Sequence, residues 1–363
     1  MKVKAGDILN WPKIAGTLLL AAHSDGECRA AIELAAHLLR EGKLVAFPTE
    51  TVYGLGASAM EASAVTRLFA AKGRPADNPL IVHLASAVQV ETLAQNIPEE
   101  AWLLAESFWP GPLTLVLESR KIVPQEVTGG LDSVALRVPA HPVALALLRE
   151  VGLPVAAPSA NLSGRPSPTT AAHVLEDLAG RIEAVLDGGP CTVGVESTVL
   201  DIRGGRPVLL RPGGVTAEEI SVSLGKECVN FAWQEADGGK PPSPGLKYTH
   251  YAPRAPLYLV QGQPEAVLAR LAELLADFRG CGLSVGLLLC AENAAKLPAE
   301  QVEILGRRED PASLAANLYG ALRRFDQKGV DVILAEGYAE EGLGVALMNR
   351  LRKAAGPRLV EAK

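Results

Sequence analysis

Apolar residues along the first two thirds of the chain recur in two periods, one helical and one typical of strands. Between Cys28 and Arg40 they fall at helical spacing, and Gly42 just beyond is a common helix-ending residue. Lys43–Phe47 predicts a short buried strand. The same patterns predict strands at Leu80–Leu84, Leu113–Leu117, Val134–Val138, Val155–Ala157, Ala184–Leu186, Thr198–Ile202 and Val208–Leu210, and helices at Ala62–Ala71, Glu99–Phe108, Pro142–Glu150 and Thr170–Leu178. This mixture favours an α/β or α+β domain with a large sheet.

The pattern breaks down between Glu218 and Pro256. The prolines and glycines of Gly238–Gly245 cannot support a helix or a central strand. After Pro256 strands and helices alternate, which indicates a small, doubly wound parallel sheet; the strands are expected at Leu257–Val260, Ser284–Leu289, Val302–Leu305 and Val330–Ala335, and the helices at Pro264–Phe278, Pro311–Gln327 and Leu343–Ala355. We therefore expect a first domain at 1–217, a linker or lid at 218–255 and a second domain at 256–363.

Composition narrows the class of protein. Of 363 residues, 48% are hydrophobic and 21% charged, which excludes disorder as a description of the whole chain. The net charge of −6 disfavours a mostly electrostatic nucleic-acid binder. No signal peptide or membrane span is visible, and the cysteines form no CxxC pair. We therefore expect a soluble, cytoplasmic protein with incidental thiols; the five are Cys28, Cys191, Cys228, Cys281 and Cys290.

The common catalytic motifs are missing. The chain contains no GxxxxGK[ST], HExxH or GxSxG pattern. Tyr53–Ala59 satisfies a loose GxGxxA dinucleotide pattern, but Pro48–Thr51 separates its first glycine from the preceding apolar run. We therefore expect a glycine turn there, leading into the helix near Ala62.

Polar residues inside apolar or Gly/Pro-rich segments are better candidates. Lys72 and Arg74 lie two residues apart, with Asn78 in the same proline-rich loop and His83 in the next strand. Lys72 could be an ordinary cation at a helix C-terminus. A loop fixed by two prolines is nevertheless well suited to present binding groups, and we favour that interpretation.

The strand Val134–Val138 would carry one cation on a face of small residues. Alternation places Ser133, Ala135 and Arg137 on that face, although an edge-strand arginine pointing into water fits nearly as well. Further along, Ser159 and Asn161 share a parity after a short strand, which ordinary turn chemistry could also explain.

Together these features point to a polyphosphate site built without a P-loop. Four cations lie among small hydroxyls and glycines, namely Lys72, Arg74, Arg137 and Arg211. No paired cysteines or histidines suggest a transition metal held by the protein. A nucleotide would bring Mg²⁺, held largely by phosphates and water.

Seven motifs in register resemble the YrdC-like domain of L-threonylcarbamoyladenylate synthases. They are Pro48–Gly56, Lys72–Pro75 with Asn78–Leu80, Trp109–Thr114, Ala135–Pro139, Pro158–Asn161, Glu196–Val199 and Arg211–Gly213. Ser243–Pro253 and the following α/β domain resemble the long, two-domain form of that enzyme. The resemblance implies a twisted mixed sheet with a positively charged cavity in a catalytic domain, followed by a Rossmann-like domain.

The resemblance implies that L-threonine, bicarbonate or CO₂ and ATP are joined into threonylcarbamoyl-AMP and pyrophosphate. Other proteins would use this product to modify tRNA, and we expect neither stable nucleic-acid binding nor membrane binding. Carried over by motif, the residues on the threonine and carbamate side would be Thr51, His83, Arg137, Ala157 and Ser197. Those holding ATP would be Lys72, Arg74, Asn78, Ser133, Ser159, Asn161, Arg211 and, from a lid, Tyr251. Lys72 and Arg74 would be the catalytic cations. No covalent enzyme intermediate is expected, because no activated nucleophile is visible.

Two alternatives stay open at this point. The chain could be an RNA-binding module of the same fold without catalysis, or a carbamoyl-adenylate enzyme that uses another amine. For the second domain we favour a role in stability or in anchoring the lid. The loop after Val330–Ala335, with Gly337–Tyr338 and Gly342–Gly344, could alternatively form a ligand site at a carboxyl strand end.

Overall fold

A computed structural model describes residues 11–22, 25–225, 230–231, 250–297 and 299–363. The chain divides into two compact units. The first comprises Met1–Ser163, Pro168–Thr192 and Glu196–Lys247, and the second Gly164–Ser167, Val193–Val195 and Tyr248–Lys363. Most of the expected Pro/Gly-rich linker, including Ser243–Thr249 of the lid motif, lies outside the described residues. Among those that are described, no helix is both long and apolar enough to cross a membrane.

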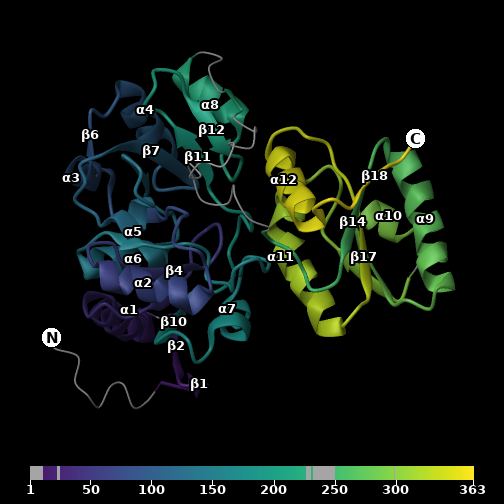
Figure 1. The fold of residues 1–363 in the computed structure, drawn as a ribbon, viewed down its shortest axis with the longest axis horizontal. Helices are drawn as coiled ribbons and strands as arrows, with labels where there is room; N and C mark the ends of the chain where they lie inside the picture. The colour runs from purple at the N-terminus through teal and green to yellow at the C-terminus, as the bar shows by residue number, and fades with distance from the viewer. Residues whose placement is uncertain (1–10, 23–24, 226–229, 232–249, 298) are drawn as a thin grey trace. The chain divides into compact units, whose positions relative to one another are not determined.

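The first unit is built on one large mixed sheet (Figure 1). Its strands are β1 (Lys13–Ile14), β2 (Thr17–Ala21), β3 (Val45–Phe47), β4 (Gly54–Ser58), β5 (Ile81–His83), β6 (Ala94–Gln95), β7 (Leu113–Ser119), β8 (Ser133–Arg137), β9 (Val155–Ala156), β10 (Ala184–Asp187), β11 (Thr198–Asp201), β12 (Val208–Arg211) and β13 (Asn230–Phe231). Their order is β1-β2-β10-β3-β4-β9-β5-β8-β7-β11-β12-β13, with β6 paired to β7. Both parallel and antiparallel pairs occur, which confirms the expected mixed sheet.

Helices pack against this sheet through aliphatic faces. They are α1 (Asp25–Arg40), α2 (Ala62–Lys72), α3 (Val90–Leu93), α4 (Glu99–Phe108), α5 (Gln125–Thr128), α6 (Pro142–Val151), α7 (Ala171–Leu178) and α8 (Ala217–Leu224). The end of α2 is sharply defined, because Gly73 adopts the left-handed conformation and its N–H donates to the carbonyl of Ala70. This cap places Lys72 at the last helical position.

One expectation about Gly54–Ser58 is wrong. The glycine turn expected there is strand β4, which pairs with β3 and β9. Its glycines serve close packing, because a Cβ on Gly56 would lie only 2.9 Å from the Phe47 ring and 3.1 Å from Val155. Isolated glycines within strands often mark such close approaches.

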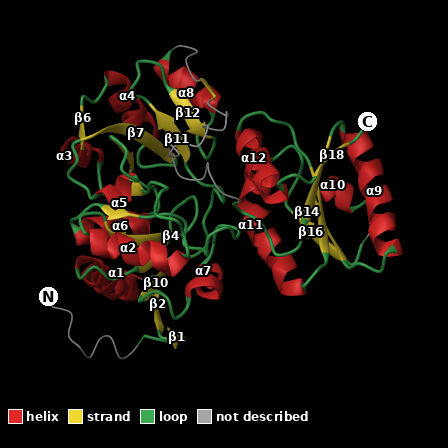
Figure 2. Cartoon of the chain, viewed as in Figure 1, coloured by secondary structure: helices red, strands yellow, loops and turns green. Residues whose placement is uncertain are grey.

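The second unit contains a separate parallel sheet with helices on both faces. Its strands are β14 (Leu257–Gln261), β15 (Val285–Leu289), β16 (Gln301–Ile304), β17 (Val332–Glu336) and β18 (Leu359–Glu361), in the order β16-β15-β17-β14-β18. Every pair is parallel, which confirms the expected Rossmann-like arrangement. The helices are α9 (Pro264–Gly280), α10 (Ala291–Ala294), α11 (Pro311–Lys328) and α12 (Leu343–Ala355). Figure 2 shows α9 and α10 on one face of the sheet and α11 and α12 on the other.

Candidate active site

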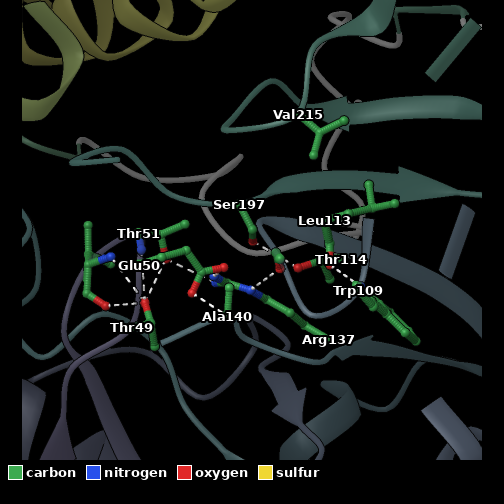
Figure 3. Close-up of polar contacts among 12 residues, drawn as sticks. Thr49, Glu50, Thr51, Trp109, Leu113, Thr114, Arg137, Ala140, Ser197 and Val215 are labelled. Carbon is green, nitrogen blue, oxygen red and sulfur yellow. Dashed lines mark hydrogen bonds and ion pairs between the residues drawn. The ribbon is translucent and has the colours of Figure 1, made fainter. Parts of the chain in front are cut away.

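The first unit contains a buried ion pair between Arg137 and Glu50 (Figure 3). Arg137 ends β8, and its Nη2 donates to Glu50 Oε1 at 2.6 Å. The second oxygen of Glu50 accepts from the backbone N–H of Ala140 at 3.0 Å, and Arg137 Nε donates to the carbonyl of Gly111 at 3.1 Å. The two side chains are only 4% and 9% exposed. The guanidinium is therefore fixed in orientation as well as neutralised in charge.

Threonine hydroxyls extend this network. Arg137 Nη1 donates to Thr51 Oγ1 at 3.0 Å, and the hydroxyls of Thr51 and Thr49 lie 2.8 Å apart. Thr49 donates its own proton to the carbonyl of Val52 at 2.6 Å. Because that proton is engaged, Thr51 donates to Thr49 and accepts from Arg137. The loop after β3 therefore presents an ordered run of hydroxyls beside the guanidinium.

His83 lies directly beside Arg137 in the sheet. It ends β5 and is paired in parallel register with Arg137 of β8. The imidazole is buried, and the Phe47 ring meets it edge-on with centroids 5.9 Å apart. Burial, reinforced by the positive charge of Arg137, lowers the pKa of His83 to about 3. The imidazole is therefore neutral near pH 7.

A second cluster joins β7, β11 and β12. The Ser197 hydroxyl lies 2.8 Å from that of Thr114, and Arg211 Nη2 donates to the Ser197 carbonyl at 2.9 Å. The loop after β12 must approach closely here, since a Cβ on Gly213 would meet backbone atoms of Glu196, Ser197 and Thr198 at 2.3 Å. Glycine at 213 is therefore required by packing.

Lys72 closes the loop that follows β9. Its ammonium donates to the carbonyls of Ser159 and Asn161, and the Asn161 amide donates to the carbonyl of Leu162 at 2.8 Å. A bridge between Gly54 and Ser159 connects this loop to β4. Helix α2, strand β4 and the 158–161 loop therefore meet at one point, although Lys72 and Ser159 are far apart in sequence.

Asn78 stands out in the loop that leads into β5. Its side chain is completely buried, yet neither its amide nitrogen nor its carbonyl oxygen finds a hydrogen-bond partner among the described residues. A buried amide without partners is costly, so this side chain keeps hydrogen-bonding capacity that the described residues do not use. Arg74 is held nearby, with Nη2 donating to the carbonyl of Pro79 at 3.3 Å.

Three other sequence-derived candidates have different surroundings. Ala157 is buried just after β9, and its N–H donates to the carbonyl of Ile81 at 2.9 Å. Ser133 opens β8, at the opposite end of the strand from Arg137. Tyr251 belongs to the second unit, where its ring lies 5.5 Å from that of Tyr319.

The sequence reasoning did not assign roles to Glu50, Thr49 or Thr114. Glu50 had a detectable signal, since it is a carboxylate that directly follows a buried strand. Its partner Arg137 lies 87 positions further along, and no local pattern connects the two. Thr114 ends the motif Trp109–Thr114, but only the fold shows its hydroxyl beside Ser197.

Two family profiles cover almost all of the chain that follows the first helix. Residues 37–213 match the Sua5–YciO–YrdC family, described as "Telomere recombination", and residues 215–356 match "Threonylcarbamoyl-AMP synthase, C-terminal domain". The chain is 53% identical to the threonylcarbamoyl-AMP synthase of Pyrococcus abyssi over 330 residues, which are 91% of this chain and 95% of that protein. The chain belongs to the threonylcarbamoyl-AMP synthase family.

Further relatives agree with this membership. The threonylcarbamoyl-AMP synthase of Bacillus subtilis is 52% identical over 91% of this chain and 94% of its own length. The crystal structure of Pyrococcus abyssi Sua5 complexed with L-threonine superposes with a TM-score of 0.89 at 50% identity, covering 96% of this chain and all of that one. The chain is therefore an enzyme of the two-domain form of this family, as its motifs predicted.

Proposed function

We propose that this chain joins L-threonine, bicarbonate or CO₂ and ATP into threonylcarbamoyl-AMP, with release of pyrophosphate. One observation carries the proposal in a chain of this family. The fixed arginine Arg137 and the neutral histidine His83 are neighbours in the sheet, and the loop before β5 holds Asn78, a buried asparagine without a hydrogen-bond partner among the described residues. This reaction would be the first step of tRNA threonylcarbamoyladenosine modification. Other proteins would receive its product, without stable binding of tRNA to this chain, and we place the reaction in the cytoplasm.

The threonine side of the reaction would be centred on Arg137. Its three recorded hydrogen bonds use three of the five N–H donors of a guanidinium, so two remain for the threonine carboxylate. Neutral His83 and the Thr51 hydroxyl would contact the amine side, and Ala157 and Ser197 would complete the pocket. A neutral imidazole suits this place, because a second positive charge would repel the ammonium group that must lose a proton.

The nucleotide side would use the cations and amides. Lys72, Arg74 and Arg211 would face phosphates, and the Asn78 side-chain amide would form a hydrogen bond with the nucleotide. Ser133, Ser159 and Asn161 would make the remaining nucleotide contacts within the first unit, and the lid role of Tyr251 stays a prediction. We propose that Mg²⁺ arrives with ATP, held largely by phosphates and water. When bound, this ion would neutralise phosphate charge.

The chemistry requires no enzyme nucleophile. The threonine amine captures CO₂ as a carbamate, and a carbamate oxygen attacks the α-phosphorus of ATP. The new bond is carbamate oxygen to phosphorus, and the bond that breaks joins the α-phosphorus to the pyrophosphate oxygen. Positioning and charge contacts are the main catalytic effects in such transfers. Lys72 and Arg74 would stabilise the charge that moves onto the pyrophosphate.

The test is pyrophosphate release that depends on both threonine and bicarbonate. We expect Lys72→Ala to lower this rate by about 10²–10³-fold, since one preorganised charge contact is lost. Lys121→Ala is the matched control, because that lysine is exposed and forms an ion pair with Asp132, which is exposed as well. A rate that stays near wild type in Lys72→Ala would remove its catalytic role.

Two further outcomes would contradict the function itself. Release that another amino acid supports better than threonine would reassign the amine substrate. RNA binding with no ATP consumption would replace the enzyme by a binding module.

A further inference from the structure

The carboxyl ends of the parallel strands in the second unit surround a cavity of about 440 Å³. Glu265 and Leu268 reach it from the helix after β14. Glu292 and Lys296 come from the segment after β15, while Arg308 and Glu309 follow β16. A cavity of this size falls within the range of small-molecule sites.

The topology makes this edge of the sheet a favourable place for a ligand. Strand β14 leads into α9 on one face, whereas its parallel neighbour β17 leads into α12 on the opposite face (Figure 2). Strand β15, the other neighbour of β17, leads into α10 on the face of α9. Ligands of open α/β sheets bind in the crevice at the carboxyl ends of the strands, where the connections from neighbouring strands lead to opposite faces of the sheet.

A buried carboxylate fixes the principal cation of the cavity. Glu336 ends β17 with no exposed surface and accepts from Arg308 Nη2, from the N–H of Cys290, from Asn293 Nδ2 at 2.6 Å and from the Tyr338 hydroxyl at 3.3 Å. The Arg308 guanidinium also lies over the Tyr338 ring, 5.5 Å from its centroid. Arg308 is thus oriented by buried groups while its side chain stays 29% exposed.

Charges of both signs line the cavity. Arg308 and Lys296 are cationic, whereas Glu265, Glu292 and Glu309 are anionic. Glu309 already pairs with Arg307 at 2.6 Å, and Glu292 accepts from the backbone N–H of Arg308 at 3.1 Å. This surplus of carboxylates disfavours a phosphate ligand, and two cations disfavour a simple amine. A ligand with one negative and one positive group matches the lining.

The thiol at this edge does not change that interpretation. Burial and the neighbouring Glu336 carboxylate raise the pKa of the Cys290 thiol to about 12. A thiol that stays protonated is a poor nucleophile, so Cys290 supplies no reason to expect covalent chemistry here.

We propose that this cavity binds a small zwitterion of the α-amino-acid class, with Arg308 and Lys296 on its carboxylate and Glu292 and Glu265 on its ammonium group. Leu268 offers an apolar surface to its side chain. The site belongs to the second unit and uses none of the residues assigned to the synthetase reaction.

The test is calorimetric titration of the full-length chain with each proteinogenic L-amino acid. We expect at least one to bind wild type and to bind Arg308→Gln at least about tenfold more weakly, because a charge-assisted contact is lost. Arg270→Gln is the matched control, since Arg270 is on α9 but pairs with Glu273 outside the cavity. Threonine binding that persists in Arg308→Gln belongs to the first unit.

Two further measurements keep the proposal open to refutation. Lys296→Gln changes an exposed residue of the rim, so it should weaken binding and can replace Arg308→Gln if that variant fails to fold. Hydrogen exchange should slow in the segments after β14, β15 and β16 when the amino acid binds.

Three results would overturn the proposal. The first is no binding heat that depends on Arg308. The second is equally tight binding of the corresponding amine or carboxylic acid alone. The third is Arg308-dependent binding of inorganic phosphate or AMP in place of any amino acid.

Discussion

Each unit of this protein holds an arginine against a buried glutamate, but the two pairs are built in opposite ways. In the first unit the arginine ends a strand and the glutamate reaches it from a loop, and both side chains are almost inaccessible. In the second unit Glu336 ends the strand and is fully buried, while Arg308 comes from a loop and is 29% exposed. In both places the buried carboxylate orients an arginine, so a buried glutamate does not by itself define a binding site.

The neighbouring groups make the difference. Around Arg137 lie neutral hydroxyls and a neutral imidazole, with Lys72 and Arg211 in adjoining clusters. Besides its partner Glu336, Arg308 shares its cavity with three further carboxylates and one lysine. The first arrangement suits a polyphosphate and a carboxylate together, and the second suits a zwitterion. The net charge of −6 describes neither, because it averages over the whole chain.

Replacing each arginine by alanine tests whether the two ion pairs contribute equally to the stability of their units. Arg137→Ala leaves Glu50 charged and buried, so we expect the free energy of unfolding of the first unit to fall by about 3–5 kcal/mol. Arg308→Ala should cost the second unit less, about 1–3 kcal/mol, because Asn293, Tyr338 and a backbone N–H still bind Glu336. Only Arg137→Ala should also abolish pyrophosphate release.

The two units can be followed separately. Trp11, Trp102 and Trp109 belong to the first unit, and the described part of the second unit contains no tryptophan, so fluorescence in urea follows the first unit. The fourth tryptophan, Trp233, lies outside the described residues and is replaced by Phe in all the proteins compared. Hydrogen exchange of β17 reports on the second. Adding Glu50→Gln to Arg137→Ala should restore part of the lost stability, since the unpaired charge disappears. Equal losses of activity in both single variants would refute the division of roles.

Two buried asparagines, one in each unit, differ in their hydrogen bonding, so replacing them should change stability in opposite directions. Asn293 donates to Glu336, whereas Asn78 has no hydrogen-bond partner among the described residues. Asn78→Leu should therefore stabilise the ligand-free first unit by about 1 kcal/mol and raise the KM for ATP by about tenfold. Asn293→Leu should destabilise the second unit by about 1–3 kcal/mol and leave that KM unchanged.

Thermal unfolding without ligand and initial rates at varied ATP measure both effects. A loss of stability in Asn78→Leu would mean that the amide already has a partner in the free protein. An unchanged KM for ATP would remove Asn78 from the nucleotide site.

Most of the secondary structure follows from local patterns. Helical spacing located α1, α2 and α11, and strict alternation after Pro256 predicted the parallel sheet. Strand β2 was not found, because it is defined by parallel pairing of Leu18 with Ala184 far along the chain. Strand β4 was missed since its glycines look like a turn until Phe47 and Val155 pack against them.

The site was predictable in its residue types but not in its connections. Cations and hydroxyls beside glycine pointed to phosphates, and the motifs supplied the threonine side. No local signal pairs Glu50 with Arg137 or Glu336 with Arg308, because such contacts depend on tertiary packing. The charged cavity of the second unit was overlooked for the same reason. Its lining residues follow three different strands and meet only in the folded sheet.

His83 offers the smallest expected contrast between the units. Its protonation should change the stability of the first unit, to which it belongs, as the pH falls. Its pKa is about 3 in the folded chain against about 6.5 in an unfolded one, so the folded state favours the neutral form. The resulting stability is fully present above pH 6.5 and is lost as the pH falls from about 6.5 towards 3. The free energy of unfolding, measured by fluorescence, should therefore fall more steeply with decreasing pH in wild type than in His83→Gln. The pKa of His141 is lowered by burial as well, but that residue is present in both proteins and cancels in the difference.

Exposed His37 provides the control, since His37→Gln should reproduce the wild-type slope. Hydrogen exchange of β17 in the second unit should respond to acid equally in all three proteins. Parallel stability curves for wild type and His83→Gln between pH 7 and 4 would show that the imidazole takes up a proton without penalty. A charged imidazole would then share the pocket with the guanidinium of Arg137, and the neutral contact proposed for the threonine amine would have to be abandoned.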